Sequence, residues 1–225
     1  VDVTSPVSAG LSDRLITDLD IAYLRGYGST CQPGATITRA DVAQMFYNLL
    51  RDKNVIITTS FDVVPADQWY ATAVNTLASL GIIQGVGDNL FVPDSPITRA
   101  EFVAIAMRFT NGEHTVTENI FSDISEDSWY YSDALGAVSY GWIQGYGNGR
   151  FFPEENITRA EVTAVANRML GRQADRAFIE EHADELKSQF TDVQNTNWAY
   201  YDIVEATNAH GFISSNLEEV WTEIL

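Results

Sequence analysis

Cysteine is almost absent from this sequence: Cys31 is the only one among 225 residues, so no intrachain disulfide can form. Because no histidine lies near it in the sequence, we interpret Cys31 as a small hydrophobe and not as a redox or nucleophilic residue. Lysine is also scarce, since only Lys53 and Lys187 among the 13 basic residues are not arginine. Arginine therefore supplies nearly all the positive charge, and its planar fork matches carboxylates and phosphates.

Positive charge as a whole is rare. The 13 Lys and Arg residues stand against 31 Asp and Glu, which gives a formal net charge of -18 and a pI near 4.3. Duplex DNA and anionic membrane surfaces would be repelled, so we expect no nucleic-acid partner. No uncharged apolar run approaches the roughly 18 residues that span a bilayer, and we expect no membrane insertion. The sequence begins at Val1 without a charged segment followed by an apolar one, so we expect a mature or excised fragment of a secreted protein.

Metal-ligand patterns are missing as well. The three histidines, His114, His182 and His210, show no ligand spacing, so we expect no metal site and no cofactor. His182 fits an ordinary face residue of a charged amphipathic helix. His210 immediately precedes Gly211, and we expect it at the C-terminal end of a helix, where the helix dipole favours its charge.

The sequence does contain an internal repeat. A Thr-Arg-Ala-acid tetrapeptide starts at Thr38, Thr98 and Thr158, at a spacing of 60 residues (98 - 38 and 158 - 98). Two further markers recur in fixed order: a Phe and an Asp that precede a Trp, and a Gly-x-Gly turn. The first marker is Phe61, Asp62 and Trp69, then Phe121, Asp123 and Trp129, then Phe190, Asp192 and Trp198; the second starts at Gly26, Gly85 and Gly145.

The apolar spacing predicts two helices per copy, joined by a glycine-rich loop. The Trp helix ends at a glycine cap, Gly81 or Gly141, and the second helix starts at the Thr. Because the chain begins with a second half and ends with a first half, we predict that the C-terminal Trp198 helix completes the unit begun by the Thr38 helix and closes a pseudo-threefold arrangement. The expected parts are a linker (1–17), a second half-repeat (18–60), two modules (61–120 and 121–172), a connecting helix (173–189), and a first half-repeat (190–212) with a tail to residue 225.

The tetrapeptide has the form of a capping box. The Thr hydroxyl accepts a hydrogen bond from the amide three residues later, and the acid there reaches back to the Thr amide. An isoleucine before each Thr and an apolar residue four positions after it form a hydrophobic staple. We therefore interpret the acid as a cap in preference to a catalytic residue. Asp41 is shorter than Glu101 and Glu161, and we expect it to cap less well.

Capping does not explain the arginine. Arg39, Arg99 and Arg159 each occupy the first helical position, where their charge faces the positive end of the helix dipole. Two explanations stay open. The arginine and the free amides of the helix start together suit a carboxylate or phosphate ligand. Alternatively, the arginine forms an ion pair with an acid of a neighbouring unit, such as Asp62, Asp123 or Asp192.

Aromatic residues near the loops are candidates for contact with a sugar. Tyr27 and Tyr146 lie at loop tips, and Val86 replaces them in the second copy, which predicts a weaker site there. The Trp of the first marker also suits carbohydrate stacking. Its helical position beside Ala and Val favours core packing instead, and we expect it to be buried.

Together these motifs resemble the S-layer homology (SLH) domain family over about residues 18 to 212. The matching segments are Phe-x-Asp before Trp, Gly-Ile or Gly-Trp-Ile, Gly-Tyr-Gly, Phe-x-Pro and Ile-Thr-Arg-Ala-Glu. The resemblance implies an all-α, three-lobed body around a central helix bundle, with grooves that bind secondary cell-wall polymers, often pyruvylated. With the loop tyrosines, it places the carbohydrate-binding residues at Arg39, Arg99, Arg159, Tyr27, Gly28, Gly87, Tyr146 and Gly147. A pyruvyl ketal carries a carboxylate, which agrees with an arginine at a helix start.

From these features we expect a non-catalytic cell-wall anchor of a bacterial surface protein, monomeric as an isolated domain, that binds a pyruvylated, anionic polysaccharide. The alternative is a structural module of a surface lattice that acts through self-association. An enzyme is disfavoured, because every candidate acid recurs threefold at a cap or turn, whereas catalysis needs one distinctive constellation. Any catalysis is expected in another portion of the parent protein.

Overall fold

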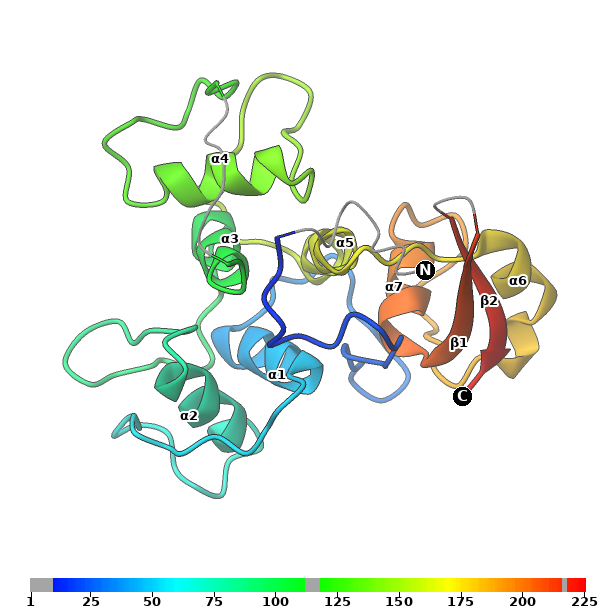
Figure 1. Cartoon of the computed structure of the whole chain (residues 1–225), viewed down its shortest axis with the longest axis horizontal. Coiled ribbons are helices and arrows are strands. Elements are labelled where there is room, and N and C mark those ends of the chain that lie inside the picture. Colours follow the sequence, from blue (N-terminus) through cyan, green and yellow to red (C-terminus); the bar gives the residue numbers. More distant parts are fainter. Residues whose placement is uncertain (1–9, 112–117, 216–217) are drawn as a thin grey trace. The chain divides into compact units, whose positions relative to one another are not determined.

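The computed structural model describes residues 10–111, 118–215 and 218–225 (Figure 1). His114 lies outside the described residues. The α-helices are α1 (Arg39–Leu49), α2 (Ala71–Ser79), α3 (Arg99–Met107), α4 (Tyr131–Ser139), α5 (Arg159–Leu170), α6 (Arg176–Glu181) and α7 (Tyr200–Thr207). A 3-10 turn, η1 (Ala183–Glu185), follows α6. The predicted mainly helical class is confirmed. Among the described residues, no helix has both the length and the apolar character that crossing a bilayer requires.

The chain ends in an element that the repeat pattern did not predict. Residues after α7, expected as a tail, form an antiparallel hairpin of β1 (His210–Ser215) and β2 (Glu218–Ile224). His210 opposes Ile224 in this hairpin. The expectation that His210 ends a helix was wrong: α7 ends at Thr207, and His210 starts β1. The strand pairing supplies partners for the backbone of this segment, which a helix terminus would not do.

The chain divides into two compact units. The central unit comprises residues 10–15 and 36–157, and the terminal unit comprises residues 16–35 and 158–225 in its described part. Each unit has its own helix pairs and its own loops. The three-lobed arrangement of the whole chain stays a prediction.

In the central unit the three isoleucines that precede the tetrapeptides form a closed ring of backbone hydrogen bonds. Ile37 donates to Ile157 (3.2 Å), Ile97 donates to Ile37 (3.2 Å), and Ile157 donates to Ile97 (3.0 Å). All three side chains are buried. The hydrophobic staple residue of each copy therefore also joins the copies to one another, because its amide and carbonyl are used between copies and not within one helix.

Helix packing in the central unit pairs each tetrapeptide helix with the Trp helix that follows it: α1 with α2, and α3 with α4. Phe46 of α1 stacks on Phe102 of α3 and on Phe109, with ring centroids 5.9 and 4.8 Å apart. These aromatic contacts fill the core between α1 and the end of α3.

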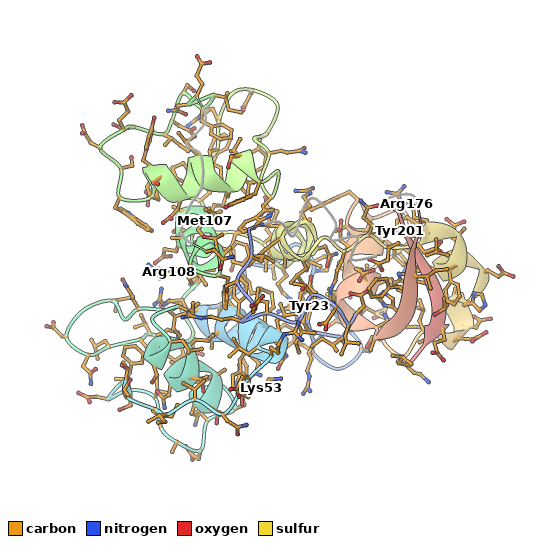
Figure 2. The ribbon with its side chains drawn as sticks, in the orientation of Figure 1. Tyr23, Lys53, Met107, Arg108, Arg176 and Tyr201 are labelled. Carbon is orange, nitrogen blue, oxygen red and sulfur yellow. The ribbon has the colours of Figure 1, made fainter. Side chains whose placement is uncertain are left out.

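The same pairing recurs in the terminal unit, where α5 packs on α7. Asn167 of α5 donates to the carbonyl of Asp202 in α7 (3.0 Å), and the buried Tyr23 hydroxyl donates to Asn167 (2.5 Å; Tyr23 is labelled in Figure 2). The hairpin lies beside α6 and α7 (Figure 1), and its Trp221 joins Ile179 of α6 in a small core. The polar network at Asn167 and the apolar cluster at Trp221 thus both connect segments of this unit that are distant in sequence.

The helix caps follow the sequence closely. A complete capping box is present at Thr38, Thr98 and Thr158. The reach of Asp41 is poorer, as expected: its carboxylate is 3.4 Å from the Thr38 amide, against 2.9 Å for each of the two glutamate caps. Gly81 and Gly141 follow α2 and α4 with φ of 74° and 73°, the left-handed conformation that glycine adopts at little cost.

Candidate functional site

Each tetrapeptide arginine is buried and holds the glycine-rich loop of another copy. Arg39 donates from Nε to the Phe91 carbonyl (2.9 Å) and from Nη2 to the Gln84 carbonyl (2.7 Å). Arg99 donates from Nε to the Phe151 carbonyl (2.9 Å). The accepting residues are 60 positions apart, as are the arginines, so the contact repeats with the motif.

The third arginine makes the same contact in the terminal unit. Arg159 donates from Nε to the Cys31 carbonyl (2.8 Å) and from Nη2 to the Arg25 carbonyl (2.6 Å). Cys31 therefore takes the loop position that Phe91 and Phe151 hold in the other copies, and its side chain is buried. The tetrapeptide arginine has a folding role that neither sequence-based explanation included: it satisfies backbone carbonyls of a loop, which need a donor when buried.

In two of the copies the Asp of the Phe-Asp-Trp marker caps the amides of the same loop. Asp123 accepts hydrogen bonds from the amides of Phe151 and Phe152, both at 2.8 Å. Asp192 accepts from the amides of Cys31 (2.8 Å) and Gln32 (2.7 Å). Asp192 of the C-terminal half-repeat thus caps the first loop, whereas the helix of that half-repeat, α7, packs on α5.

These amide hydrogen bonds change the acidity of both carboxyl groups. Burial pushes the pKa of Asp123 upward, but the Phe151 and Phe152 amides and the Arg150 charge outweigh it and lower the pKa below its usual value. The pKa of Asp192 is lowered for the same reason: partial burial is outweighed by hydrogen bonds from the first loop and by the Arg159 charge. Both groups are therefore carboxylates at neutral pH.

The Phe of the marker explains the first glycine of each Gly-x-Gly turn. A Cβ added at Gly85 would lie 2.8 Å from the Phe61 ring and 2.5 Å from the Leu90 carbonyl oxygen, closer than real Cβ atoms approach. Gly145 faces Phe121 in the same way, at 2.6 Å. The second glycines differ: Gly28, Gly87 and Gly147 have φ of 64°, 105° and 76°, with no described atom within 4 Å of an added Cβ. They shape the turn at the open surface and do not pack against the core.

The loop tyrosines cover two of the arginines. Tyr27 stacks on Arg159 and Tyr146 stacks on Arg99, with ring centroids 4.6 and 4.7 Å from the guanidinium carbon. Both tyrosines remain about half exposed. In the second copy Val86 stands at the tyrosine position, so Arg39 lacks this aromatic cover. Five of the eight expected binding residues thus form two Arg–Tyr pairs and one arginine, Arg39, that stacks on Phe91 instead (4.8 Å from the guanidinium carbon to the ring centroid).

The prediction that the recurring Trp is buried was wrong. Trp69, Trp129 and Trp198 are 59%, 63% and 65% exposed, whereas the next residue, Tyr70 or Tyr130, is buried. The helix starts only after that tyrosine, so the Trp precedes the buried face instead of lying on it. Three exposed indole rings at equivalent positions are poorly explained by packing, and they fit a surface that contacts sugar rings.

One such Trp lines a groove with Arg39 in the central unit. The groove has a volume of about 210 Å³ and is lined by Arg39, Gln84, Val86, Glu101, Arg108 and Trp129, among others. Arg39 forms an ion pair with Glu101 (3.3 Å), and Arg108 donates to the Ile82 carbonyl (2.7 Å) on the α2 side of α3. Arg108 is labelled at the end of α3 in Figure 2.

The charge of this groove differs in sign from that of the chain. Two arginines and one glutamate give it +1 (2 - 1), while the whole protein carries -18. Burial lowers the pKa of Arg39, and Glu101 partly offsets this effect, so a ligand carboxylate would find a poorly hydrated guanidinium. Sequence reasoning missed Trp129, Arg108 and Glu101 as groove residues. The indole was detectable as a recurring marker, but its exposure depends on where the helix begins.

Comparisons with known proteins agree with this architecture. The model of the S-layer homology domain matches residues 62–103 and 120–163. The chain is 33% identical over 216 residues to the cellulosome-anchoring protein of Acetivibrio thermocellus, a match that covers 90% of this chain and 46% of that protein. It is 30% identical over 220 residues to cell surface glycoprotein 1 of the same organism, covering 91% of the chain and 9% of that protein. An amylopullulanase of Thermoanaerobacterium thermosulfurigenes is 33% identical over 150 residues, 64% of the chain and 8% of that protein. The chain spans less than half the length of each of these relatives.

Proposed function

Because this chain belongs to the S-layer homology domain family, we propose that it is a non-catalytic anchor that attaches a bacterial surface protein to its cell wall by binding an anionic glycan. The location at the bacterial cell surface or cell wall follows from the family and from relatives that are themselves named as surface proteins. The match covers only 8% of the amylopullulanase, so most of that enzyme lies outside the segment that resembles this chain.

The observation that carries the proposal is the groove at Arg39. It combines a guanidinium that also contacts loop carbonyls, Glu101 and the Phe91 ring, a second arginine, and an exposed indole face. A sugar ring that carries a carboxylate fits this set, because the ring stacks on the Trp and the carboxylate pairs with the arginines. We infer that a pyruvylated saccharide is the ligand and that Arg99 with Tyr146 and Arg159 with Tyr27 form two further sites of the same type, with Gly28, Gly87 and Gly147 shaping the loop edges.

Trp129→Ala is the sharpest test, because the indole is exposed and the change leaves the arginine clamps intact. We expect binding to purified cell walls and to a pyruvylated disaccharide to weaken about tenfold, the loss of roughly 1.4 kcal/mol of stacking. Ile56→Ala is the matched control, since Ile56 is 85% exposed and lies outside the groove lining. Its affinity should equal that of the unchanged chain.

The result that would sink the proposal is unchanged wall binding by Trp129→Ala combined with no calorimetric signal for the disaccharide. A triple change of Arg39, Arg99 and Arg159 to Ala is a poorer test, because it also removes the donors of buried loop carbonyls and destabilises the fold. Sedimentation decides the alternative of lattice assembly: we expect a monomer that binds walls, whereas self-association without wall binding would favour the lattice role.

A further inference from the structure

Four titratable side chains that are distant in sequence meet inside the terminal unit. They are Asp20 from the segment before the first loop, Glu205 from α7, His210 from β1 and Glu219 from β2. One ligand-type atom from each lies within 4.8 Å of the others. Asp20, Glu205 and His210 are buried, and the Glu219 side chain is 8% exposed. None of them belongs to the recurring markers, so the glycan-binding proposal does not account for them.

The histidine faces the three carboxylates with its Nε2 atom. Nδ1 lies 3.0 Å from the Asn208 carbonyl, so it carries a proton and donates there. Nε2 lies 3.0 Å from Glu219 Oε1, 3.3 Å from Asp20 Oδ2 and 3.6 Å from Glu205 Oε1. A lone pair and three carboxylate oxygens at these distances repel one another unless positive charge lies between them.

Three oxygen atoms of the cluster lack a hydrogen-bond donor among the described residues. Within the described residues, no group hydrogen-bonds to either oxygen of Glu205 or to Oδ2 of Asp20. Arg172 supplies one positive charge, with Nε 2.9 Å from Asp20 Oδ1. Three carboxylates and one guanidinium leave a charge of -2 (-3 + 1) in a buried site, which is strongly unfavourable without compensation.

We propose that Asp20, Glu205, His210 and Glu219 bind a divalent transition-metal ion of the Zn²⁺ or Mn²⁺ class. Four ligands at roughly 2.0–2.2 Å in a tetrahedron lie about 3.3–3.6 Å from one another. The three distances from His210 Nε2, 3.0 to 3.6 Å, fall around that range. One imidazole with three carboxylates suits these ions, whereas Ca²⁺ and Mg²⁺ take oxygen ligands.

The surroundings have the form of an outer coordination shell. The Asn208 carbonyl fixes the ring of His210, and Trp221 donates from Nε1 to Glu219 Oε1 (3.0 Å). Trp221 also stacks on the imidazole, with ring centroids 3.6 Å apart. Such partners orient metal ligands and raise their basicity. The ion would tie the segment before the first loop to α7 and to both strands, and so fasten the two sequence-distant halves of the terminal unit.

Protons are the competing occupants. Burial raises the pKa of Glu205 to about 8, and for His210 the effect of burial is outweighed by Asp20 and Glu219, which raise the pKa to about 10. Two protons therefore neutralise the cluster when no cation is bound, and metal binding displaces them. A cluster that binds metal releases these protons when metal is added, whereas a cluster that holds only protons does not respond. A metal titration therefore distinguishes the two.

Calorimetry on the full chain, dialysed first against a chelator, measures the site directly. We expect one Zn²⁺ or Mn²⁺ per chain, weaker binding of Ca²⁺ and Mg²⁺, and a rise in the melting temperature of roughly 5–10 °C at a hundredfold excess of metal over Kd. Glu205→Gln and His210→Gln should each weaken binding by about 100-fold or more. His182→Gln is the matched control, because His182 stacks on Phe178 outside the cluster, and it should bind as the unchanged chain does.

Two results would overturn the proposal. One is the absence of any stoichiometric site in the unchanged chain, which needs no variant and holds even if the variants fail to fold; protons alone would then occupy the cluster. The other is equal metal binding by Glu205→Gln, His210→Gln and the control, which would assign the metal to the acidic surface. Neither result touches the glycan groove, whose test uses Trp129 in the other unit.

Discussion

Asp192→Ala probes the joint between the two ends of the repeat array. Asp192 lies in the C-terminal half-repeat, and its carboxylate accepts hydrogen bonds from Cys31 and Gln32 of the first loop, at 2.8 and 2.7 Å. The change removes both acceptors and touches no helix. If the C-terminal half-repeat completes the first loop, the variant must destabilise the terminal unit.

The size of the effect follows from the environment of the two amides. Cys31 is fully buried, so its amide loses its partner without access to water, which costs about 1–3 kcal/mol. Gln32 is exposed, and water replaces the lost bond at a cost of about 0.5–1 kcal/mol. The sum is about 1.5–4 kcal/mol, which lowers the melting temperature by roughly 3–16 °C for a chain of this size.

Differential scanning calorimetry measures this shift and shows which transition carries it. Asp184→Ala is the matched control, because it removes an exposed carboxylate of the same unit from η1 and should shift the midpoint by less than about 1 °C. Asp123→Ala, which removes the equivalent pair of hydrogen bonds in the central unit, should destabilise by a similar amount. Wild-type melting of Asp192→Ala beside a destabilised Asp123→Ala would refute the closure of the first loop by the chain's other end.

Three further predictions concern stability. Asp41→Glu should raise the free energy of unfolding by a few tenths of a kcal/mol in urea titrations, because the longer acid closes the 3.4 Å gap to its cap amide; a loss of stability would contradict this. Trp142→Ala should lower the free energy of unfolding by about 3–5 kcal/mol in the same assay, since that indole is fully buried. Trp69→Ala should change it by no more than about 0.5 kcal/mol, because that side chain is exposed. Similar losses for the two variants would show that Trp69 is packed. Stability should fall below about pH 4, because the folded-state pKa values of Asp123 and Asp192 are lowered. Their contribution to stability is complete above the unfolded-state pKa and is lost as pH falls through the folded-state values. An Asp123→Ala, Asp192→Ala double variant should therefore lose less stability than the unchanged chain on acidification.

Much of the local structure could be predicted from the repeat. A capping box needs only a Thr and an acid three positions apart, so Thr98 and Glu101 define the start of α3 without any distant contact. The same holds for the glycine after α2, whose positive φ is a local requirement. The contacts of Arg39 were not predictable in this way, because its partners are the carbonyls of residues 84 and 91. Every residue has a backbone carbonyl, so the sequence does not reveal which one accepts the hydrogen bond.

The exposed Trp shows the limit of helical periodicity. Trp129 lies one turn before the apolar face of α4, and a start shifted by two residues turns an expected core residue into a groove residue. His210 shows a second limit: its lack of ligand spacing says nothing about Asp20, which lies 190 positions away along the chain and touches it only after folding.

By itself, the sequence determined the helix starts, the turn glycines, the order of the copies and the family, since each depends on residues within a few positions of one another. Only the tertiary structure decided what the tetrapeptide arginines hold, which aromatic rings face solvent, and that four polar side chains converge behind the C-terminal hairpin. Those outcomes depend on contacts between segments 50 to 190 residues apart, whose geometry is set by packing and by the pairing of buried backbone groups.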